Sequence, residues 1–447
     1  MSEAVGRDPL GAFREEIGRG TVPQPTAPDL MPTAQALKEL EEEQNLFRAA
    51  RRKGNARVAA NPQSEPTPEE TMVPKPPLVF QRQLASELKA RLRLAIESET
   101  GFIERLVWFW SNHFAVSISK GAQTRVSVGS YEREAIRPHV LGRFEDMLLA
   151  VEQHPTMLFY LDNQLSVGPN SPAGRNRRRG LNENLAREIL ELHTLGVNGG
   201  YGQDDVVALA KILTGHQIAG LDGRLGEPGT TVFNPGLHEP GPVTLLKTVY
   251  PDTGADQARS ALRALAHHPS TARHIARKLV VHFLSDRPDA AAVERLESVF
   301  RKTGGDLKAV SLALLDLPQA GETEFSKIRL PQEFVVAGFR LCNLQADRLY
   351  GVFMQGLRAL GQAVWNPGGP DGFPDDAAHW ESAEGIKTRL DVAASIARRA
   401  QSLDPRLLAE QGLGELAAAE TLQSIRAAES RAQGIAILLM SPEFQRR

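Results

Sequence analysis

The sequence lacks most features of a disulfide-bonded, exported or membrane-spanning protein. Its single cysteine, Cys342, excludes a disulfide within the chain, so cysteine usage does not indicate an oxidising compartment. No apolar run reaches roughly 18 residues, and the N-terminal stretch has no apolar core of a secretion signal. We therefore expect no membrane insertion and a cytoplasmic location, with export on a signal-bearing partner left open.

Several common functional motifs are also missing. The chain has no GxGxxG after a predicted strand, no Walker A sequence, and no HExxH, CxxC or GxSxG segment. These absences argue against the usual nucleotide enzymes and serine hydrolases. The formal net charge is -2, whereas a nucleic-acid surface needs an excess of basic residues. We expect no nucleic-acid partner.

Helical patterns dominate what is present. Apolar residues recur at helical spacing in 81–98, 133–162, 182–195 and 269–285, and loops rich in glycine and proline separate them. Strand patterns are few, although TTVF at 230–233 and VTLL at 243–246 could pair as a short hairpin. The sequence predicts an all-α protein, a large multi-helical single body with Gly/Pro-rich loops and at most one short β-hairpin.

A change of composition near residue 78 divides the chain. Residues 1–78 are predicted to form an N-terminal arm and Pro-rich linker with one helix, at 34–53. Residues 79–447 form the predicted helical body. Its central polar half is 79–256, and its C-terminal helical half is 257–447.

The predicted helix 182–195 has one strongly polar face. At about 100° per residue, an arc of roughly 140° collects three carboxylates, one arginine and one amide, which are Glu183, Glu188, Glu191, Arg187 and Asn184. One interpretation is a solvated face, with Arg187 four residues from both Glu183 and Glu191. The other is a buried cluster whose excess negative charge would hold a divalent cation, meet further arginines, or raise the pKa of one carboxyl group.

Other polar residues could accompany this helix, and each also has a structural interpretation. His113 follows two tryptophans and is either a ligand or base, or a packed histidine bonded to a carbonyl. Asp162 and Asn163 are either caps or oxygen ligands. His238 either lines a site or is solvated. Lys278, between His274 and His282 on one helix face, is expected to neutralise the acidic face.

Longer blocks carry a family resemblance. NENLAREILELHTLGV followed by GGY and DDVVALAKILTG resembles the central signature of the bacterial family catalogued as domain of unknown function 1800. Further blocks resemble that family in the same order, namely FWSNHF at 109–114, MLFYLDNQLS at 157–166, HPSTARHIARKLVVHFLSDRP at 268–288, KIRLPQEFVVAGFR at 327–340, LGQAVWNPGGPDGFPDD from 360, and the terminal SPEFQRR. The resemblance covers roughly residues 80–447.

The resemblance implies site residues and a partner but no settled activity. The family's motif residues fall on Asn112, His113, Asp162, Asn163, Asn182, Glu183, Asn184, Arg187, Glu188 and Glu191. His216 and Phe373 stand where the family usually has tryptophan, and both changes would reshape a pocket wall or its substrate. Genes of the family often neighbour genes of sulfatase-like proteins, which implies a sulfatase-like partner.

Two function classes follow. The first is a hydrolase or lyase assisted by carboxylates or a divalent metal. Its predicted catalytic residues are Glu183, Glu188, Glu191, His113 and Arg187. Its predicted substrate-binding residues are Asn163, Asn182, Asn184, His216 and His238. A divalent cation is the candidate cofactor, with Asp162, Glu183 and Glu191 as hypothetical ligands. The second class is a non-enzymatic helical scaffold, or a maturation or export partner of the sulfatase-like protein. An enzyme requires the polar face to share a cavity with His113 and His238, whereas a scaffold predicts a closed, fully paired network.

Overall fold

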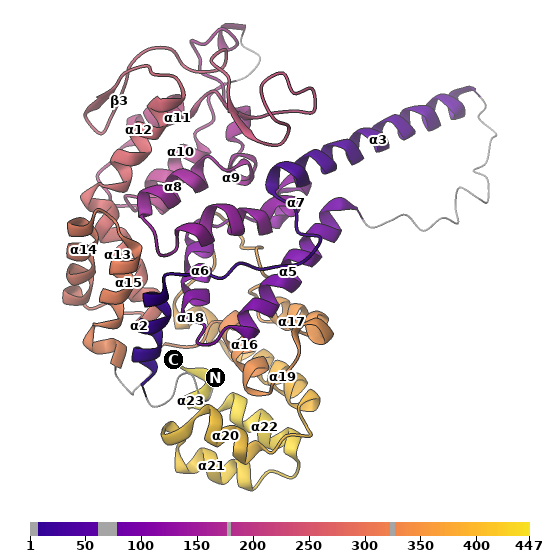
Figure 1. Cartoon of the computed structure of the whole chain (residues 1–447), viewed down its shortest axis with the longest axis vertical. Helices are drawn as coiled ribbons and strands as arrows, with labels where there is room; N and C mark the ends of the chain where they lie inside the picture. Colours follow the sequence, from indigo (N-terminus) through magenta and orange to yellow (C-terminus); the bar gives the residue numbers. More distant parts are fainter. Residues whose placement is uncertain (1–7, 61–77, 177–179, 322–326) are drawn as a thin grey trace.

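The structure is a computed structural model that describes residues 8–60, 78–176, 180–321 and 327–447. Helices form nearly all of its regular structure, which confirms the predicted all-α fold (Figure 1). One continuous apolar core includes residues from Ile17 near the start of the chain to Phe444 near its end. None of the described helices has both the length and the apolar composition of a membrane span.

The N-terminal segment contains two helices where the sequence predicted one. Helix α2 (Pro9–Arg19) starts at Asp8, whose carboxylate accepts a bond from Gly11 N, and ends at Gly20 in the left-handed conformation. It packs against α15 (Leu307–Leu315). It buries Ile17 completely. The sequence prediction missed this short helix, because the packing against α15 that stabilises it joins segments far apart in the chain.

Helix α3 (Thr33–Ala60) is longer than the predicted 34–53, so the first part of the predicted linker is helical. Its first turns pack Ala36 and Leu37 against Val79 and Val126. Farther along, α3 extends away from the body (Figure 1). The remaining predicted linker, at 61–77, lies outside the described residues.

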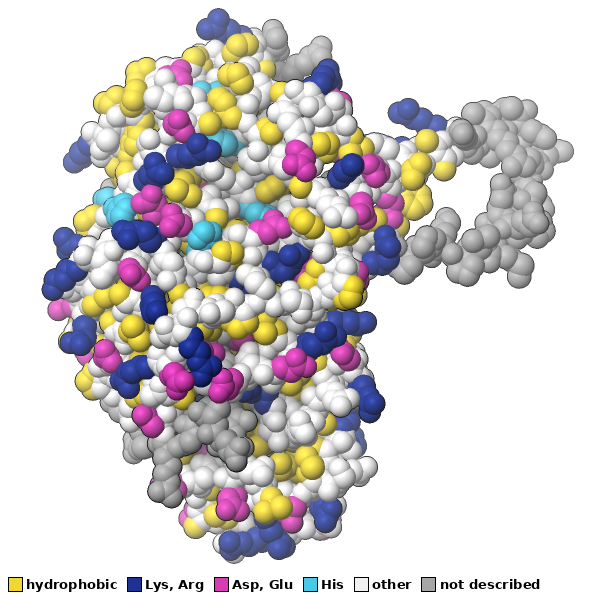
Figure 2. Space-filling view, in the orientation of Figure 1, with side chains coloured by type: hydrophobic (Ala, Val, Ile, Leu, Met, Phe, Trp, Pro, Cys, Tyr) yellow, Lys and Arg dark blue, Asp and Glu magenta, His cyan; other side chains and the backbone are white. Residues whose placement is uncertain are grey.

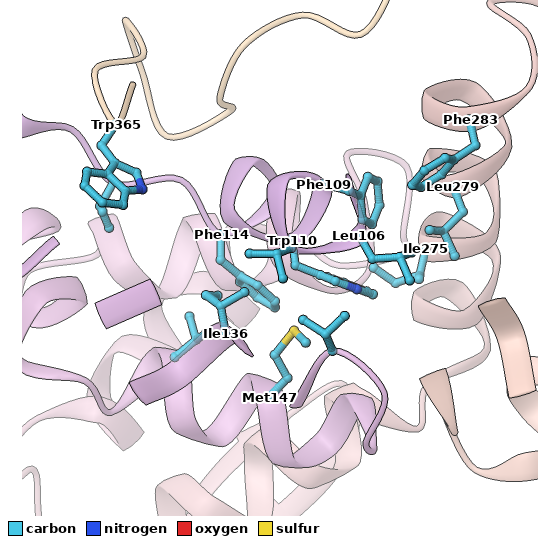
Figure 3. Close-up of a cluster of buried hydrophobic side chains, with 14 of the residues drawn as sticks. Leu106, Phe109, Trp110, Phe114, Ile136, Met147, Ile275, Leu279, Phe283 and Trp365 are labelled. Atoms are coloured by element: carbon cyan, nitrogen blue, oxygen red, sulfur yellow. The ribbon is translucent and has the colours of Figure 1, made fainter. Parts of the chain in front are cut away.

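The middle of the molecule is built on three helices, α5 (Val79–Glu97), α6 (Phe102–His113) and α7 (Ala122–Tyr131). Helix α6 presents Phe109 and Trp110 to the interior, where Figure 3 shows them among side chains of other helices, including Leu279 and Met147. This aromatic packing fixes the end of α6, which carries Asn112 and His113.

The two small sheets differ from the predicted hairpin. Strand β1 (His216–Ile218) pairs with β2 (Thr231–Phe233), and β3 (Val243–Leu245) pairs with β4 (Thr248–Tyr250), both antiparallel. The predicted pairing of 230–233 with 243–246 is therefore wrong. A two-residue turn explains the β3–β4 pairing, because Leu246 and Lys247 both have positive φ, at 49° and 65°.

The remaining helices complete the body, with α8–α12 above the middle layer and α16–α23 below it in Figure 1. Their bounds are α8 Phe144–Glu152, α9 Pro155–Tyr160, α10 Asn184–Glu188, α11 Gln203–Leu213, α12 Ala255–Ala266, α13 Pro269–Phe283, α14 Ala290–Thr303, α16 Pro331–Leu341, α17 Ala346–Ala359, α18 Ala377–Trp380, α19 Ala383–Arg399, α20 Pro405–Gly412, α21 Ala419–Arg426, α22 Arg431–Met440 and α23 Pro442–Gln445. Short π or 3-10 turns are η1 Ile118–Lys120, η2 Glu132–Ile136, η3 Arg137–His139, η4 Asn163–Leu165, η5 Gly174–Asn176, η6 Ile189–His193, η7 Pro318–Gly321 and η8 Gly414–Leu416.

Candidate functional site

The central polar helix begins two residues later than predicted. Asn182 precedes it, and its Oδ1 accepts a hydrogen bond from Asn184 N at 2.9 Å. Ser166 Oγ in turn accepts a bond from Asn182 N at 3.0 Å. Helix α10 then runs from Asn184 and passes into the π-turn η6. Asn182 thus lies just before the helix and stabilises its first turn. The side chain of Asn184 is exposed.

The first part of the polar face is a surface ion pair. Arg187 lies 3.3 Å from Glu183, and Gln203 bridges them, donating to Glu183 at 2.7 Å and accepting from Arg187 at 2.9 Å. Both charged side chains are more than a third exposed, at 41% for Arg187 and 34% for Glu183. At this end the solvated interpretation describes the face.

The second part of the face lies within electrostatic range of a carboxylate that is far away in the sequence. Partial burial raises the pKa of Glu188, and Glu191 and Asp371 add to this rise against opposing effects of His193 and Arg187. Burial, Glu188 and Asp371 together raise the pKa of Tyr160 to about 12. We call Glu188, Glu191 and Asp371 the acid cluster.

Asn112 holds the loop that carries Asp371. Its Nδ2 donates to Phe373 O at 2.9 Å, and its Oδ1 accepts from Phe373 N at 2.7 Å. Gly372 has φ 80°, and a Cβ there would lie 2.5 Å from Asn112 O. The contact uses only the backbone of Phe373, so the departure from tryptophan at this position leaves it intact.

Lys278 faces the same loop from α13. Burial lowers the pKa of Lys278, while Asp375 and Asp371 oppose that shift. Nearby, His282 Nδ1 lies 2.6 Å from Asp375 Oδ1. Lys278 thus faces the carboxylates of the loop, and its expected role in neutralising the acidic face of the helix stays a prediction.

Two histidines donate hydrogen bonds to backbone carbonyl groups at the end of the central helix. His113 Nε2 donates to His193 O at 3.1 Å, and His274 Nε2 donates to Leu192 O at 3.0 Å. Burial, with Lys278 as the next cause, lowers the pKa of His113 well below its ordinary value. His113 is 1% exposed, so it lies in the interior and not in an open cavity shared with Glu183.

His193, on the apolar side, is fully buried, and its Nδ1 donates to Glu152 at 2.8 Å. His113 Nδ1, His193 Nε2 and Glu152 Oε2 have no hydrogen-bond partner among the described residues. The interior network is therefore closed but not fully paired, so neither predicted outcome holds in full.

The predicted cation ligands are not brought together. Asp162, at φ 58°, pairs with Lys120 at 2.5 Å, while Glu183 pairs with Arg187. Within the described ranges no group of three or more His, Cys, Asp or Glu side chains could hold a metal ion. Asp162, Glu183 and Glu191 do not fit as one ligand set, and we derive no step through a metal.

The remaining predicted residues lie elsewhere. Asn163 is buried and donates to Leu213 O at 3.3 Å. His216 Nδ1 donates to Leu213 O at 3.2 Å, and His238 Nδ1 donates to Thr214 O at 2.9 Å. The two histidines flank Phe233, with ring centroids 5.4 and 5.1 Å away. They form a separate group beside the β1–β2 sheet, and their substrate-binding role stays a prediction.

The sequence did not identify Asp371 or Tyr160 as members of the site. Asp371 lies in the segment GGPDG, whose composition predicts only a loop. The resemblance marked the block but not this carboxylate. The face of the molecule in Figure 2 shows acidic, basic and histidine side chains interspersed, without a large patch of one charge.

The family match covers both segments of the acid cluster. The family model described as "Protein of unknown function (DUF1800)" matches residues 15–446. The chain belongs to this family. The match starts before α3 and therefore includes much of the N-terminal segment, beyond the blocks recognised from residue 80. No curated protein and no solved structure shows a significant match to this DUF1800 chain.

Proposed function

We propose that this DUF1800 protein is a hydrolase or lyase that uses the acid cluster for general acid–base catalysis. The observation that carries the proposal is that partial burial raises the pKa of Glu188, a rise to which Glu191 and, from a loop far away in the sequence, Asp371 contribute. Carboxylates with different surroundings can divide the roles of acid and base between them. Both helix residues are partly exposed, so a substrate can reach them.

Glu188 is the proposed proton donor. Its raised pKa keeps a larger share of it protonated near neutral pH than an exposed carboxyl would have. Asp371, which is exposed, is the proposed proton acceptor. Lys278 and Arg187 supply two positive charges beside the acid cluster, fewer than its three carboxylates once Glu188 has given up its proton. The field around the cluster therefore favours a neutral or cationic substrate over a phosphate or sulfate ester.

A substrate panel with paired variants tests the proposal. Neutral glycosides, esters and amides would be compared with phosphate and sulfate esters, on the full chain and on Glu188→Gln. We expect turnover of a neutral substrate that falls by about a hundredfold or more in the variant, the usual contribution of one acid–base group. The matched control is Glu183→Gln, on the same helix but in the surface ion pair. Equal losses in both variants, or activity confined to sulfate esters, would contradict the proposal.

A second candidate is a non-enzymatic partner of a sulfatase-like protein, and helix α3 favours it. Leu46 and Phe47 on α3 are 72% and 48% exposed, which is unusual for two adjacent large apolar residues. We expect the neighbouring gene product to co-purify with the wild-type chain. This co-purification should be lost in the double variant Leu46→Glu/Phe47→Glu, whose melting temperature should be unchanged. Failure of the wild-type chain to co-purify would contradict this candidate.

A further inference from the structure

A narrow cleft separate from the acid cluster lies among α6, α16 and the loop after α17. Its volume is about 50 Å³, enough for several water molecules or a small planar group, and it opens to solvent. Trp108, Trp365 and Phe373 supply much of its apolar wall. The proposed acid–base chemistry uses none of these side chains.

The charge inside the cleft is neutralised by the protein itself. The Arg91 guanidinium lies 5.8 Å from the ring centroid of Trp108 and 5.3 Å from that of Trp365. Its Nε donates to the buried Glu132 at 2.8 Å. Glu333, also in the wall, pairs with Arg105 at 3.1 Å. The cleft therefore offers no unpaired charge to an ionic ligand.

One of two glutamines in the wall leaves a hydrogen-bond donor for a ligand. In the amide orientation that satisfies its neighbours, Gln332 O accepts from Arg91 at 2.8 Å and from Trp108 Nε1 at 3.2 Å. Gln362 Oε1 accepts from Gln332 N at 2.8 Å. The amide NH₂ group of Gln362 makes no hydrogen bond within the described residues, so it remains as a donor, whereas both ends of the Gln332 amide are satisfied by the protein.

A histidine in the wall supplies an acceptor. The 2.6 Å contact of His282 Nδ1 with the Asp375 carboxylate places the ring proton on Nδ1 and leaves the lone pair on Nε2. Burial lowers the pKa of His282 despite Asp375, which keeps the ring neutral. No hydrogen bond to Nε2 is found across the described parts of the chain.

We propose that the cleft is a binding site for a small neutral carboxamide, independent of the acid–base reaction. The ligand's carbonyl oxygen accepts from the amide group of Gln362, and its NH₂ group donates to His282 Nε2. Its planar faces pack against the two indoles. A carboxylate of the same shape lacks the donor for His282 and is disfavoured by the buried acids Glu132 and Glu333.

Fluorine NMR of the full chain labelled with 5-fluorotryptophan tests this site. The four tryptophans are Trp108, Trp110, Trp365 and Trp380, and single Trp→Phe variants assign their signals. Acetamide is expected to shift Trp108 and Trp365 saturably and to leave Trp110, buried in the core, unchanged. Isosteric acetate should bind at least about tenfold more weakly. Equal binding of acetate, or no saturable shift with acetamide, would overturn the proposal.

The variant Gln362→Glu sharpens the test because it keeps the acceptor for Gln332 N, removes the NH₂ donor and adds a negative charge, and the last two changes both act against the carbonyl oxygen of the ligand. We expect acetamide binding to weaken by about tenfold. The matched control is Gln423→Glu on α21, an exposed position where binding should be unchanged. Unaltered acetamide affinity in Gln362→Glu would overturn the proposal. If that variant does not fold, the wild-type comparison of acetamide with acetate decides.

Discussion

Glu188 lies partly out of water with two further carboxylates nearby, and both conditions favour its protonated form. A carboxyl whose pKa is higher in the folded than in the unfolded chain contributes stability that is fully present below its ordinary pKa. That contribution is lost as the pH rises through the raised pKa. At neutral pH the ionised Glu188 therefore lowers the free energy of unfolding.

We expect Glu188→Gln to raise the melting temperature at pH 7 and to change it little near pH 4. The gain should not exceed about 1 kcal/mol, because the side chain is partly exposed and solvent screens its interactions. Thermal unfolding across this pH range measures the effect, with Glu183→Gln as the control that gives no gain at pH 7. A larger stabilisation at pH 4 than at pH 7 would show that burial and the neighbouring acids do not raise this pKa.

Because His193 and Glu152 form a buried pair, we expect a single substitution in it to cause a large loss of stability. Both side chains are 0% exposed, and His193→Phe would leave the carboxylate without its hydrogen-bond donor. We expect a loss of about 3 kcal/mol in denaturant unfolding, the usual order for breaking a buried polar pair. The double variant Glu152→Leu/His193→Phe should recover part of this loss. If the double variant loses as much stability as Glu152→Leu and His193→Phe lose in sum, the two side chains are not coupled across the 2.8 Å contact.

At the scale of elements, the change from α-helix to π-turn at Ile189 divides the predicted polar face. The regular helical wheel applies only as far as Glu188, and the π-turn places one additional residue in the next turn. Glu183 and Arg187 therefore remain a surface pair, while Glu188 is within electrostatic range of Asp371 in the loop after α17.

A substitution in the loop held by Asn112 should change both the stability of the protein and the pKa of Glu188. Gly372→Ala would place a Cβ 2.5 Å from Asn112 O at a residue with φ 80°, so the loop must move. We expect a loss of about 1–3 kcal/mol in stability and a fall in the pKa of Glu188, because Asp371 is displaced from it. Carbon-13 NMR of the labelled carboxyl group measures that pKa.

Gly368→Ala in the same loop is the matched control for Gly372→Ala. A Cβ at Gly368 meets nothing within 4 Å, so neither stability nor the pKa of Glu188 should change. Asn112→Asp keeps the acceptor for Phe373 N and removes the donor to Phe373 O, so it should lower stability as Gly372→Ala does. An unchanged Glu188 pKa in Gly372→Ala would mean that the loop does not position Asp371.

For the whole molecule, the N-terminal segment is not merely an arm. Ile17 of α2 is fully buried, and Phe13 stacks on Phe102 of α6 with ring centroids 5.0 Å apart. Arg14 also pairs with Asp316 at 3.0 Å. These contacts join α2 to two elements of the body. The division of the chain at residue 78 stays a prediction.

Ile17→Ala tests whether α2 unfolds together with the body. Removing this buried side chain should cost about 2–4 kcal/mol and should lower the midpoint of a single transition. Leu46→Ala, on the exposed part of α3, should change stability by less than about 0.5 kcal/mol. A separate early transition, or an unchanged midpoint in Ile17→Ala, would mean that the N-terminal segment is an independent unit.

The sequence by itself determined the features that depend on local interactions. Helical periodicity, caps and turn residues act over a few positions, so the all-α fold and the polar stripe from Glu183 to Glu191 could be read directly. Family motifs extended this to the whole chain and marked Asn112 and His113 as important. They could not say that Asn112 would hold a loop or that His113 would satisfy a helix end.

Tertiary structure alone decided which of these groups meet. Asp371 joins Glu188, His282 meets Asp375, and α2 is retained by α15 because packing of the common core brings distant segments together. No periodicity encodes these contacts, since they depend on how whole helices lie against one another. The same packing placed His113 in the interior and His238 beside Phe233, whereas nearness in sequence and resemblance had grouped both with Asp162 and Glu183 as one site.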